Sequence, residues 1–241
     1  MKPLNRVAME SSEALNKLAE FDKNGFYIEK DALNLDICNK LISQSRYLEN
    51  AKSGTYRPMM MPHRSDPHYL EALKTPKIVN TVRLFCKGEP VVGLQTEFFF
   101  CKPGTPGFSL HQDNFFVEAN YGVFLSAWIA LTDTYPENGG LIVYPGTHRE
   151  SLLPVAKKNV PASASQDPNA NSEECLVPDQ YSAINVSVPK GSALFIHGNL
   201  VHGSNTNVSG DFRYVLLCTY IKMGEKFRVG KYAQRNIVEL A

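Results

Sequence analysis

The chain has 241 residues, of which 43% are hydrophobic and 20% charged, and its formal net charge is +1. This length and composition are typical of one globular domain with a substantial core, so we expect residues 1–241 to form a single domain that is neither disordered nor fibrous. The small net charge offers no broad basic surface for phosphate backbones, so nucleic-acid binding is not expected.

The first third of the chain predicts helices. Apolar residues recur near a 3.6-residue period from Leu35 to Leu48, and Asn34 is placed to cap this segment. A second helix is predicted from Tyr69 to Cys86. Between the two, residues 53–68 combine turn formers, three methionines and basic groups, which indicate an irregular strand and loop. The N-terminal helical region is therefore expected to extend to about residue 88.

From residue 89 onward, the chain changes to short β-branched and aromatic segments separated by Gly, Pro and Asn. This pattern is typical of an all-β sandwich or barrel, here expected over about residues 89–225. Asn138-Gly139 lies between two predicted strands and favours a tight hairpin. The polar segment 157–174, rich in Pro, Ser and Asn, predicts a mobile surface loop. The predicted strands are residues 91–101, 122–131, 140–144, 184–188, 192–197 and 213–221.

The five cysteines are scattered along the chain, and none forms a CxxC pair. A disulfide framework or zinc ribbon is therefore not expected, and reduced thiols fit a cytoplasmic protein. Residues 1–21 contain no continuous apolar segment, and no later stretch approaches the roughly 18 apolar residues of a membrane span. We expect a soluble, intracellular protein that does not bind a membrane.

His111 and Asp113 are ligand-type side chains at positions i and i+2, which point from the same face of an extended strand. Downstream, His197 and His202 each offer a third ligand. Two imidazoles and one carboxylate make the facial triad that leaves open positions on non-haem iron(II). An HxD triplet also arises by chance, and a histidine is often a hydrogen-bonded structural residue.

Arg213 follows His202 across a turn-rich segment, so a hairpin would return it beside the metal strand. Its guanidinium can hold a carboxylate through two hydrogen bonds. Ser204, two residues after His202, can add a hydroxyl on the same face. Taken alone, Arg213 is better explained as a solvated or ion-paired arginine.

The ordered motifs resemble those of the phytanoyl-CoA dioxygenase family. The resemblance covers about residues 95–221 through HQDNFF, SAWIALTDTYPENGGLIVYPGTHRES, KGSALFIHGNLVHGSNTN and FRYVLL. It implies a mainly β fold with flanking helices, the double-stranded β-helix, which is a cupin-like jelly roll. It also implies Fe(II) bound by His111, Asp113 and His202, because the family spacing to Ser204 and Arg213 selects His202.

The resemblance further implies 2-oxoglutarate as cosubstrate and O2 as oxidant. It assigns Arg213 and Ser204 to the distal carboxylate of 2-oxoglutarate and Trp128 to the wall of the cosubstrate pocket. Family members often add a lysine contact from an upstream region, where this chain offers Arg57. Glu97 stands where the family commonly has an apolar residue, so it is expected to be paired or turned toward the substrate.

The implied activity is that of a dioxygenase that hydroxylates an aliphatic C–H bond of a small metabolite and releases succinate and CO2. Asp113 favours hydroxylation over halogenation, because related halogenases have a small residue at that place. Two alternatives stay open: a non-catalytic jelly-roll module that binds a metabolite or metal, and a metal-dependent cupin enzyme that does not use 2-oxoglutarate. The loops at residues 52–68, 114–121 and 155–180 are expected to form the mouth of the site, and the substrate and oligomeric state are not assigned.

Other histidines and aromatic residues have simpler interpretations. His148 lies at a turn that ends a strand, which favours a structural hydrogen bond over metal binding. His63 and His68 are expected to be solvated loop residues, with a substrate entrance as the alternative. Residues 98–100 are three phenylalanines expected to fill the barrel core on alternating faces, and Phe115 and Phe116 are candidates for the rim of the site.

Overall fold

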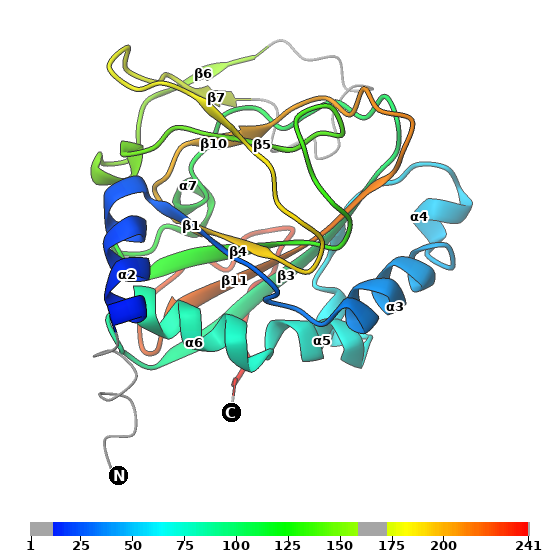
Figure 1. Cartoon of the computed structure of the whole chain (residues 1–241), viewed down its shortest axis with the longest axis horizontal. Helices are drawn as coiled ribbons and strands as arrows, with labels where there is room; N and C mark the ends of the chain where they lie inside the picture. Colours follow the sequence, from blue (N-terminus) through cyan, green and yellow to red (C-terminus); the bar gives the residue numbers. More distant parts are fainter. Residues whose placement is uncertain (1–11, 159–172, 241) are drawn as a thin grey trace.

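Two antiparallel sheets form the β core of the protein (Figure 1). The computed structural model describes residues 12–158 and 173–240, so the loop predicted at 157–174 lies largely outside the described residues. The larger sheet contains, in spatial order, β1 (Phe26–Glu29), β9 (Ala193–His197), β4 (Phe124–Ala130), β11 (Arg213–Lys222), β3 (Val91–Cys101) and β2 (Met59–Met60). The smaller sheet contains β10 (His202–Ser204), β5 (Leu141–Val143) and β8 (Ile184–Val186), and a separate ribbon contains β6 (Val155–Lys157) and β7 (Glu173–Cys175).

Helices cover the face of the larger sheet that is turned away from the smaller sheet (Figure 1). Asn34 caps its helix as predicted, because its side chain accepts a hydrogen bond from the backbone N–H of Asp36 at 2.7 Å. The α-helices are α2 (Ser12–Asn24), α3 (Leu35–Ser45), α4 (Glu49–Lys52), α5 (Pro67–Leu73), α6 (Pro76–Phe85) and α7 (Asn114–Val117), and the short 3-10 helices are η1 (Pro62–Arg64) and η2 (Thr147–Arg149).

The larger sheet is buried on both faces, which explains why every residue of β3 is buried. Phe98 and Phe100 pack against the helices, whereas Phe99 packs between the two sheets, as the alternation of side chains along a strand requires. Burial of each phenyl ring contributes about 1.5–3 kcal/mol to stability. The prediction that residues 98–100 fill the core on alternating faces is confirmed.

Three local predictions were wrong or incomplete. The helix expected from Tyr69 to Cys86 is two helices, α5 and α6, because Pro76 lacks an N–H group and holds Thr75 in a non-helical conformation. Asn138-Gly139 forms a turn with Gly139 at φ +90°, but no hairpin, because β4 and β5 belong to different sheets. The N-terminal region also contributes β1, an edge strand that the sequence pattern did not indicate.

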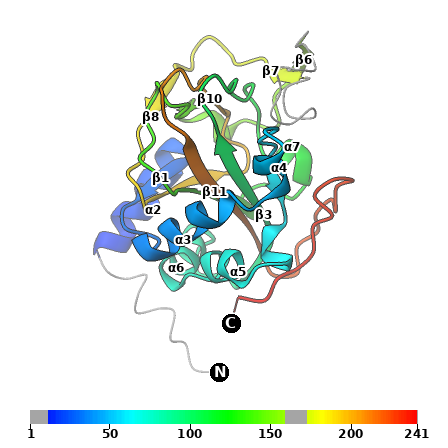
Figure 2. The same cartoon turned by 90° about the vertical axis from the view of Figure 1, so that its right-hand side faces the viewer.

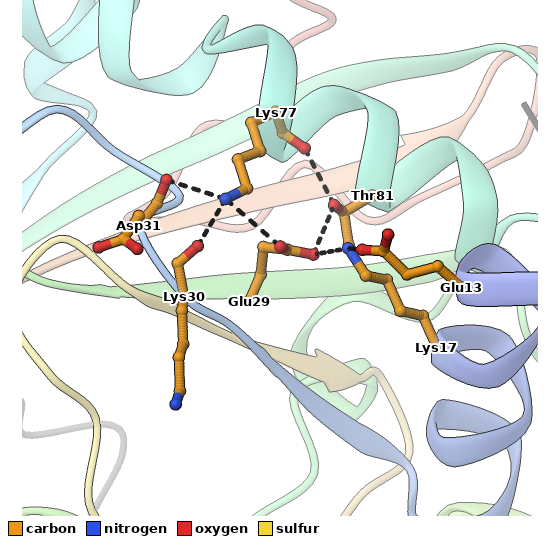
Figure 3. Close-up of polar contacts among 7 residues, drawn as sticks. All are labelled: Glu13, Lys17, Glu29, Lys30, Asp31, Lys77 and Thr81. Atoms are coloured by element: carbon orange, nitrogen blue, oxygen red, sulfur yellow. Dashed lines mark hydrogen bonds and ion pairs between the residues drawn. The ribbon is translucent and has the colours of Figure 1, made fainter.

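A buried carboxylate holds α2 and α6 against β1 (Figure 3). Glu29, at the end of β1, forms ion pairs with Lys17 of α2 at 2.8 Å and with Lys77 of α6 at 3.5 Å. Lys77 also donates to the backbone carbonyls of Lys30 and Asp31. These contacts join the first strand to the helical layer, and we refer to them as the Glu29 cluster.

None of the five cysteines, all of which lie in the described ranges, forms a disulfide, as predicted. Across residues 12–158 and 173–240, no helix is both long enough and apolar enough to cross a membrane. The cytoplasmic location stays a prediction.

Candidate functional site

His111, Asp113 and His202 meet at one end of the β core. Their ligand atoms all lie within 4.8 Å of one another. Oδ1 of Asp113 is 3.4 Å from Nε2 of His111 and 3.7 Å from Nε2 of His202. Two imidazoles and one carboxylate on one side of a small space are a donor set that suits a divalent transition metal with open coordination positions. The residues present therefore fit the implied iron.

The local backbone explains how the three side chains come together. His111 and His202 form an antiparallel bridge in which each backbone N–H donates to the other residue's carbonyl, at 2.8 and 3.0 Å. Directly opposed residues point to the same face, so the two rings lie with centroids 4.3 Å apart. The HxD spacing predicted an extended strand through Asp113. Instead, Asp113 has helical backbone angles at the start of α7. The turn after His111 brings the carboxylate to the rings.

Hydrogen bonds behind the site fix each ligand. Nδ1 of His111 lies 2.7 Å from the carbonyl of Ser109, and Nδ1 of His202 lies 3.1 Å from that of Leu200. Because a carbonyl only accepts, each Nδ1 carries the proton. Each Nε2 therefore lies on the side of the ring that faces Oδ1 of Asp113. The Ser126 hydroxyl donates to Oδ2 of Asp113 at 2.6 Å, which leaves Oδ1 toward the imidazoles.

Burial and charge keep the ligands in metal-binding protonation states. Burial, followed by the neighbouring His111, lowers the pKa of His202 to about 4, so this ring is neutral at neutral pH. Burial alone would raise the pKa of Asp113. The imidazoles of His202 and His111 and the hydroxyl of Ser126 outweigh it and hold this pKa well below its ordinary value. The site is therefore an ionised carboxylate beside a neutral imidazole.

A cavity of about 540 Å³ opens beside the triad. Arg213, Ser204 and Trp128 line it, with the guanidinium carbon of Arg213 5.7 Å from the centre of the Trp128 ring. Arg213 is 3% exposed and donates to the carbonyl of Gly139 and to Sγ of Cys101 at 2.9 Å. In the described part of the chain, no carboxylate lies within ion-pair distance of it and its Nε has no hydrogen-bond partner. A buried arginine of this kind is suited to bind an anion that enters the cavity.

Arg213 reaches the cavity by a different route from the predicted hairpin. Ser204 lies in the smaller sheet, and Arg213 begins β11 of the larger sheet, opposite Cys101. The segment between them crosses from one sheet to the other. Ser204 Oγ accepts the backbone N–H of Phe108 at 2.9 Å, so its own proton can be donated into the cavity.

The remaining candidates are divided between the cavity and the surface. Glu97 lines the cavity and accepts a hydrogen bond from Gln95 Nε2 at 3.3 Å. Arg57 is exposed and is not among the residues that line the cavity, so the structure does not bring it to the triad. Of the expected mouth, Met60 and Phe116 line the cavity, and part of residues 155–180 lies outside the described residues.

The C-terminal segment, residues 223–240, is a part of the site that sequence reasoning missed. Arg228, Lys231, Tyr232 and Arg235 from this segment line the cavity. The segment follows the last strand and has no helix or strand pattern of its own. The only signal in the sequence is its run of basic and aromatic residues.

The other histidines lie away from the cavity lining. His197 is buried, and its Nδ1 accepts the backbone N–H of Asn199 at 3.1 Å. His148 has the predicted structural hydrogen bond, to the carbonyl of Asp22 at 3.1 Å. His63 contacts the Thr96 hydroxyl at 2.7 Å, and His68 pairs with Asp66 at 2.8 Å. These contacts give each ring a structural partner.

The chain is similar in sequence to a known family and to proteins of known name. The family model for phytanoyl-CoA dioxygenase matches residues 21–215. Phytanoyl-CoA dioxygenase of Arabidopsis thaliana is 29% identical over 153 residues, which cover 63% of this chain and 52% of that protein. Ectoine dioxygenase of Nocardia farcinica (strain IFM 10152) is 27% identical over 221 residues, which cover 80% of this chain and 72% of that protein. The matches span about half the length of the plant relative.

A solved structure has the same architecture. The non-heme alpha ketoglutarate dependent epimerase SnoN from nogalamycin biosynthesis superposes with a TM-score of 0.73 at 18% identity, over 90% of this chain and 86% of that chain. At 18% identity, this similarity shows that the two proteins share a fold. Together with the two antiparallel sheets, it confirms the predicted jelly roll.

Proposed function

The chain belongs to the phytanoyl-CoA dioxygenase family, and from that premise we propose that it is an Fe(II)- and 2-oxoglutarate-dependent dioxygenase. In this proposal it hydroxylates an aliphatic C–H bond of a small molecule, with O2 as oxidant and succinate and CO2 as products. Residues 1–241 act as one catalytic domain. His111, Asp113 and His202 hold the iron.

One observation carries the proposal: a buried cationic side chain and a metal-type triad, in which His202 is buried and His111 and Asp113 are half-buried, line the same cavity. A triad alone suits many metal sites. Arg213 adds a second requirement, because its charge is desolvated and is not balanced by a carboxylate within ion-pair distance in the described ranges. A dicarboxylate that reaches from the metal to Arg213 satisfies both groups at once.

Each residue has a separate task in this proposal. Arg213 and Ser204 bind the distal carboxylate of 2-oxoglutarate, and Trp128 covers the cosubstrate and keeps water from it. Ser126 orients Asp113 so that one carboxylate oxygen faces the metal. Bound Fe(II), together with 2-oxoglutarate, supplies the activation of O2. Glu97 and Gln95 face the substrate side of the cavity.

Anaerobic addition of 2-oxoglutarate to the Fe(II)-loaded protein tests the proposal. We expect a metal-to-ligand charge-transfer band and, in air, oxygen-dependent release of succinate. Arg213→Gln should weaken 2-oxoglutarate binding by roughly 100-fold, because one charged group is left buried without its partner. Arg149→Gln, which removes an exposed arginine bound to the carbonyls of Asp22 and Lys23, is the matched control and should keep the band.

The same experiment separates the alternatives. A non-catalytic module would release no succinate under any condition. A cupin enzyme that does not use 2-oxoglutarate would show no charge-transfer band and would keep its activity in Arg213→Gln. Either result contradicts the proposed cosubstrate.

A further inference from the structure

The C-terminal segment is held across the side of the barrel by contacts at several points. Figure 2 shows it in red, beside α7. Arg228 donates its backbone N–H to the carbonyl of Val117 at 2.6 Å and forms an ion pair with Glu118 at 2.7 Å. Val238 bridges to Gly93 at the start of β3. The segment is therefore attached to both the α7 turn and the larger sheet, and its side chains close one wall of the cavity.

Arg235 is the side chain that this attachment buries. It is 9% exposed, lines the cavity, and donates from Nη1 to the carbonyls of Phe116 and Arg228 at 3.1 Å each. Within the described residues, its Nε has no hydrogen-bond partner and no carboxylate lies within ion-pair distance. Burial lowers its pKa, and the carboxylates of Asp113 and Glu97 oppose that effect, so both lie near enough to influence its charge.

The backbone around Arg235 is shaped to seat the guanidinium. Gly230 has φ +76°, and a side chain there would place its Cβ 2.8 Å from Nη1 of Arg235. The left-handed conformation favours glycine at this position, and a larger residue would also displace the end of the Arg235 side chain. A buried arginine that lines the cavity and keeps an N–H group without a partner among the described residues is suited to bind an anionic group.

The larger sheet presents hydrogen-bond acceptors to the same cavity. Ser126, Thr219 and Gln95 lie opposite one another on β4, β11 and β3, so they form one row on the inner face. Adjacent strands are about 4.8 Å apart, which places Thr219 about 5 Å and Gln95 about 10 Å from Ser126 along the row. Thr219 Oγ1 and Gln95 Oε1 are buried without hydrogen-bond partners in the described part of the chain. Glu97 adds a carboxylate to this wall.

We propose that the substrate of this site is a small amino-acid-like zwitterion, with its anionic group bound by Arg235 and its amino group bound by the acceptors of Gln95, Thr219 and Glu97. The cavity has a donor wall and an acceptor wall, and neither an acid nor an amine alone satisfies both. Arg213 is left for the cosubstrate, because it begins β11, whereas Thr219 lies six residues further along the strand. This inference rests on the proposed function and names the substrate class of the same site.

The substrate class is tested with matched compounds. For each of several carbon skeletons, the free amino acid, its deaminated acid and its carboxamide are added to Fe(II)- and 2-oxoglutarate-loaded protein, and succinate release is measured. At least one zwitterion should stimulate release, with kcat/KM at least ~10-fold above both of its partners, since each loses one charged hydrogen-bonded contact. If the zwitterions stimulate release no more than the acids or amides, the proposal is overturned.

The anaerobic charge-transfer band, measured first on the same protein, separates the two proposals. Without the band, the proposed function fails. With the band but no preference for zwitterions, only the substrate class fails.

Variants then test the role of Arg235. Arg235→Gln should raise KM for the stimulating zwitterion by roughly 10- to 100-fold, while the 2-oxoglutarate titration stays within about twofold of the parent. Arg235→Lys should recover part of the loss, because the positive charge is retained. The matched control is Arg64→Gln, which removes an arginine that holds the same segment from outside through Gln234 and Asn236. KM should change by less than about threefold in this control, because Arg64 does not line the cavity.

Two outcomes would overturn the role of Arg235. If Arg64→Gln raises KM as much as Arg235→Gln does, Arg235 acts only by holding the segment in place. If Arg235→Gln weakens 2-oxoglutarate binding and leaves KM for the zwitterion unchanged, Arg235 contacts the cosubstrate.

Discussion

Two carboxylates with little solvent exposure, Glu29 and Asp113, have different partners and different roles in this molecule. The side chain of Glu29 is 8% exposed and that of Asp113 is 14% exposed. Glu29 has two lysine ammonium groups within 3.5 Å. Asp113 instead faces two imidazoles, of which His202 is neutral at neutral pH, and one hydroxyl. The protein balances the first charge with its own side chains and leaves the second to be balanced by a bound cation.

This difference in partners distinguishes a site that stabilises the fold, at Glu29, from a site that binds a ligand, at Asp113. A buried ion pair whose partners are all side chains attracts no ligand, and its removal is felt as a loss of stability. A carboxylate that faces imidazoles and a hydroxyl, with no lysine or arginine within ion-pair distance in the described ranges, is instead able to bind a cation strongly. Loss of the charge should therefore be measured mainly as lost iron binding at Asp113 and only as lost stability at Glu29.

The largest expected effect is at Asp113. Asp113→Asn should reduce iron content and succinate release to background, because the neutral amide cannot supply the anionic ligand. The melting temperature of the metal-free protein should stay the same or fall, because the lowered pKa of Asp113 means that the fold favours the ionised carboxylate. Iron analysis, succinate assay and thermal unfolding of the metal-free protein measure this. Iron-dependent turnover in the variant would contradict the proposed triad.

The next effect is a pH dependence at the α2–β1 edge, where the backbone of His197 bonds to Gly25 and its ring packs on Phe21. Burial, followed by His148, lowers the pKa of His197 to about 4. The unfolded ring has a pKa near 6.5, so this contribution is complete above pH 6.5 and is lost as the pH falls toward 4. Its full size is about 3 kcal/mol.

Urea unfolding at pH 5 and pH 7.5 measures this dependence. The free energy of unfolding of the parent should fall at pH 5, and the fall should be smaller in His197→Gln, which cannot take up the proton. Equal slopes in both proteins would remove His197 as the source.

The features that could be predicted from the sequence depend on one continuous segment of the chain or on a fixed spacing between motif residues. β3 and β11 are long enough to show β-branched and aromatic patterns, and the predicted strands 91–101 and 213–221 agree with them closely. The resemblance to the family, through its spacing from this histidine to Ser204 and Arg213, selected His202, which the structure brings to Asp113, while His197 lies elsewhere.

The rest depends on contacts between distant segments. β1 has only four residues and gains its stability by pairing with β9, far along the chain. The residues next to Arg235 in the sequence have the composition of an ordinary surface segment. Arg235 is buried only because the C-terminal segment folds against the rest of the protein. The helix expected over residues 69–86 overlooked the break at Pro76, although a proline is visible in the sequence. Arg57 was assigned by its position in the chain alone, and the loop directs it to the surface.

A smaller effect on iron binding is expected from the hydroxyl of Ser126, which lies beside Asp113. Ser126→Ala removes the donor 2.6 Å from Asp113 and should weaken iron binding by roughly 10- to 100-fold, because outer-shell hydrogen bonds orient metal ligands. Thr81→Val is the matched control, since its hydroxyl lies 3.5 Å from Glu29. Iron titration should show no change in the control. Similar iron affinity in Ser126→Ala and the parent would mean that Asp113 needs no orienting partner.

The smallest effect is expected at Glu29 itself. Glu29→Gln leaves Lys17 and Lys77 facing each other without their carboxylate, but their side chains are 20% and 46% exposed and can regain water. The free energy of unfolding should therefore fall by about 1–2 kcal/mol, less than the 3–5 kcal/mol typical of a fully buried pair. Iron content and succinate release at 25 °C should equal those of the parent. A loss of iron together with normal stability would contradict the different roles assigned to the two carboxylates. Glu29 would then act on the metal site and not on the fold.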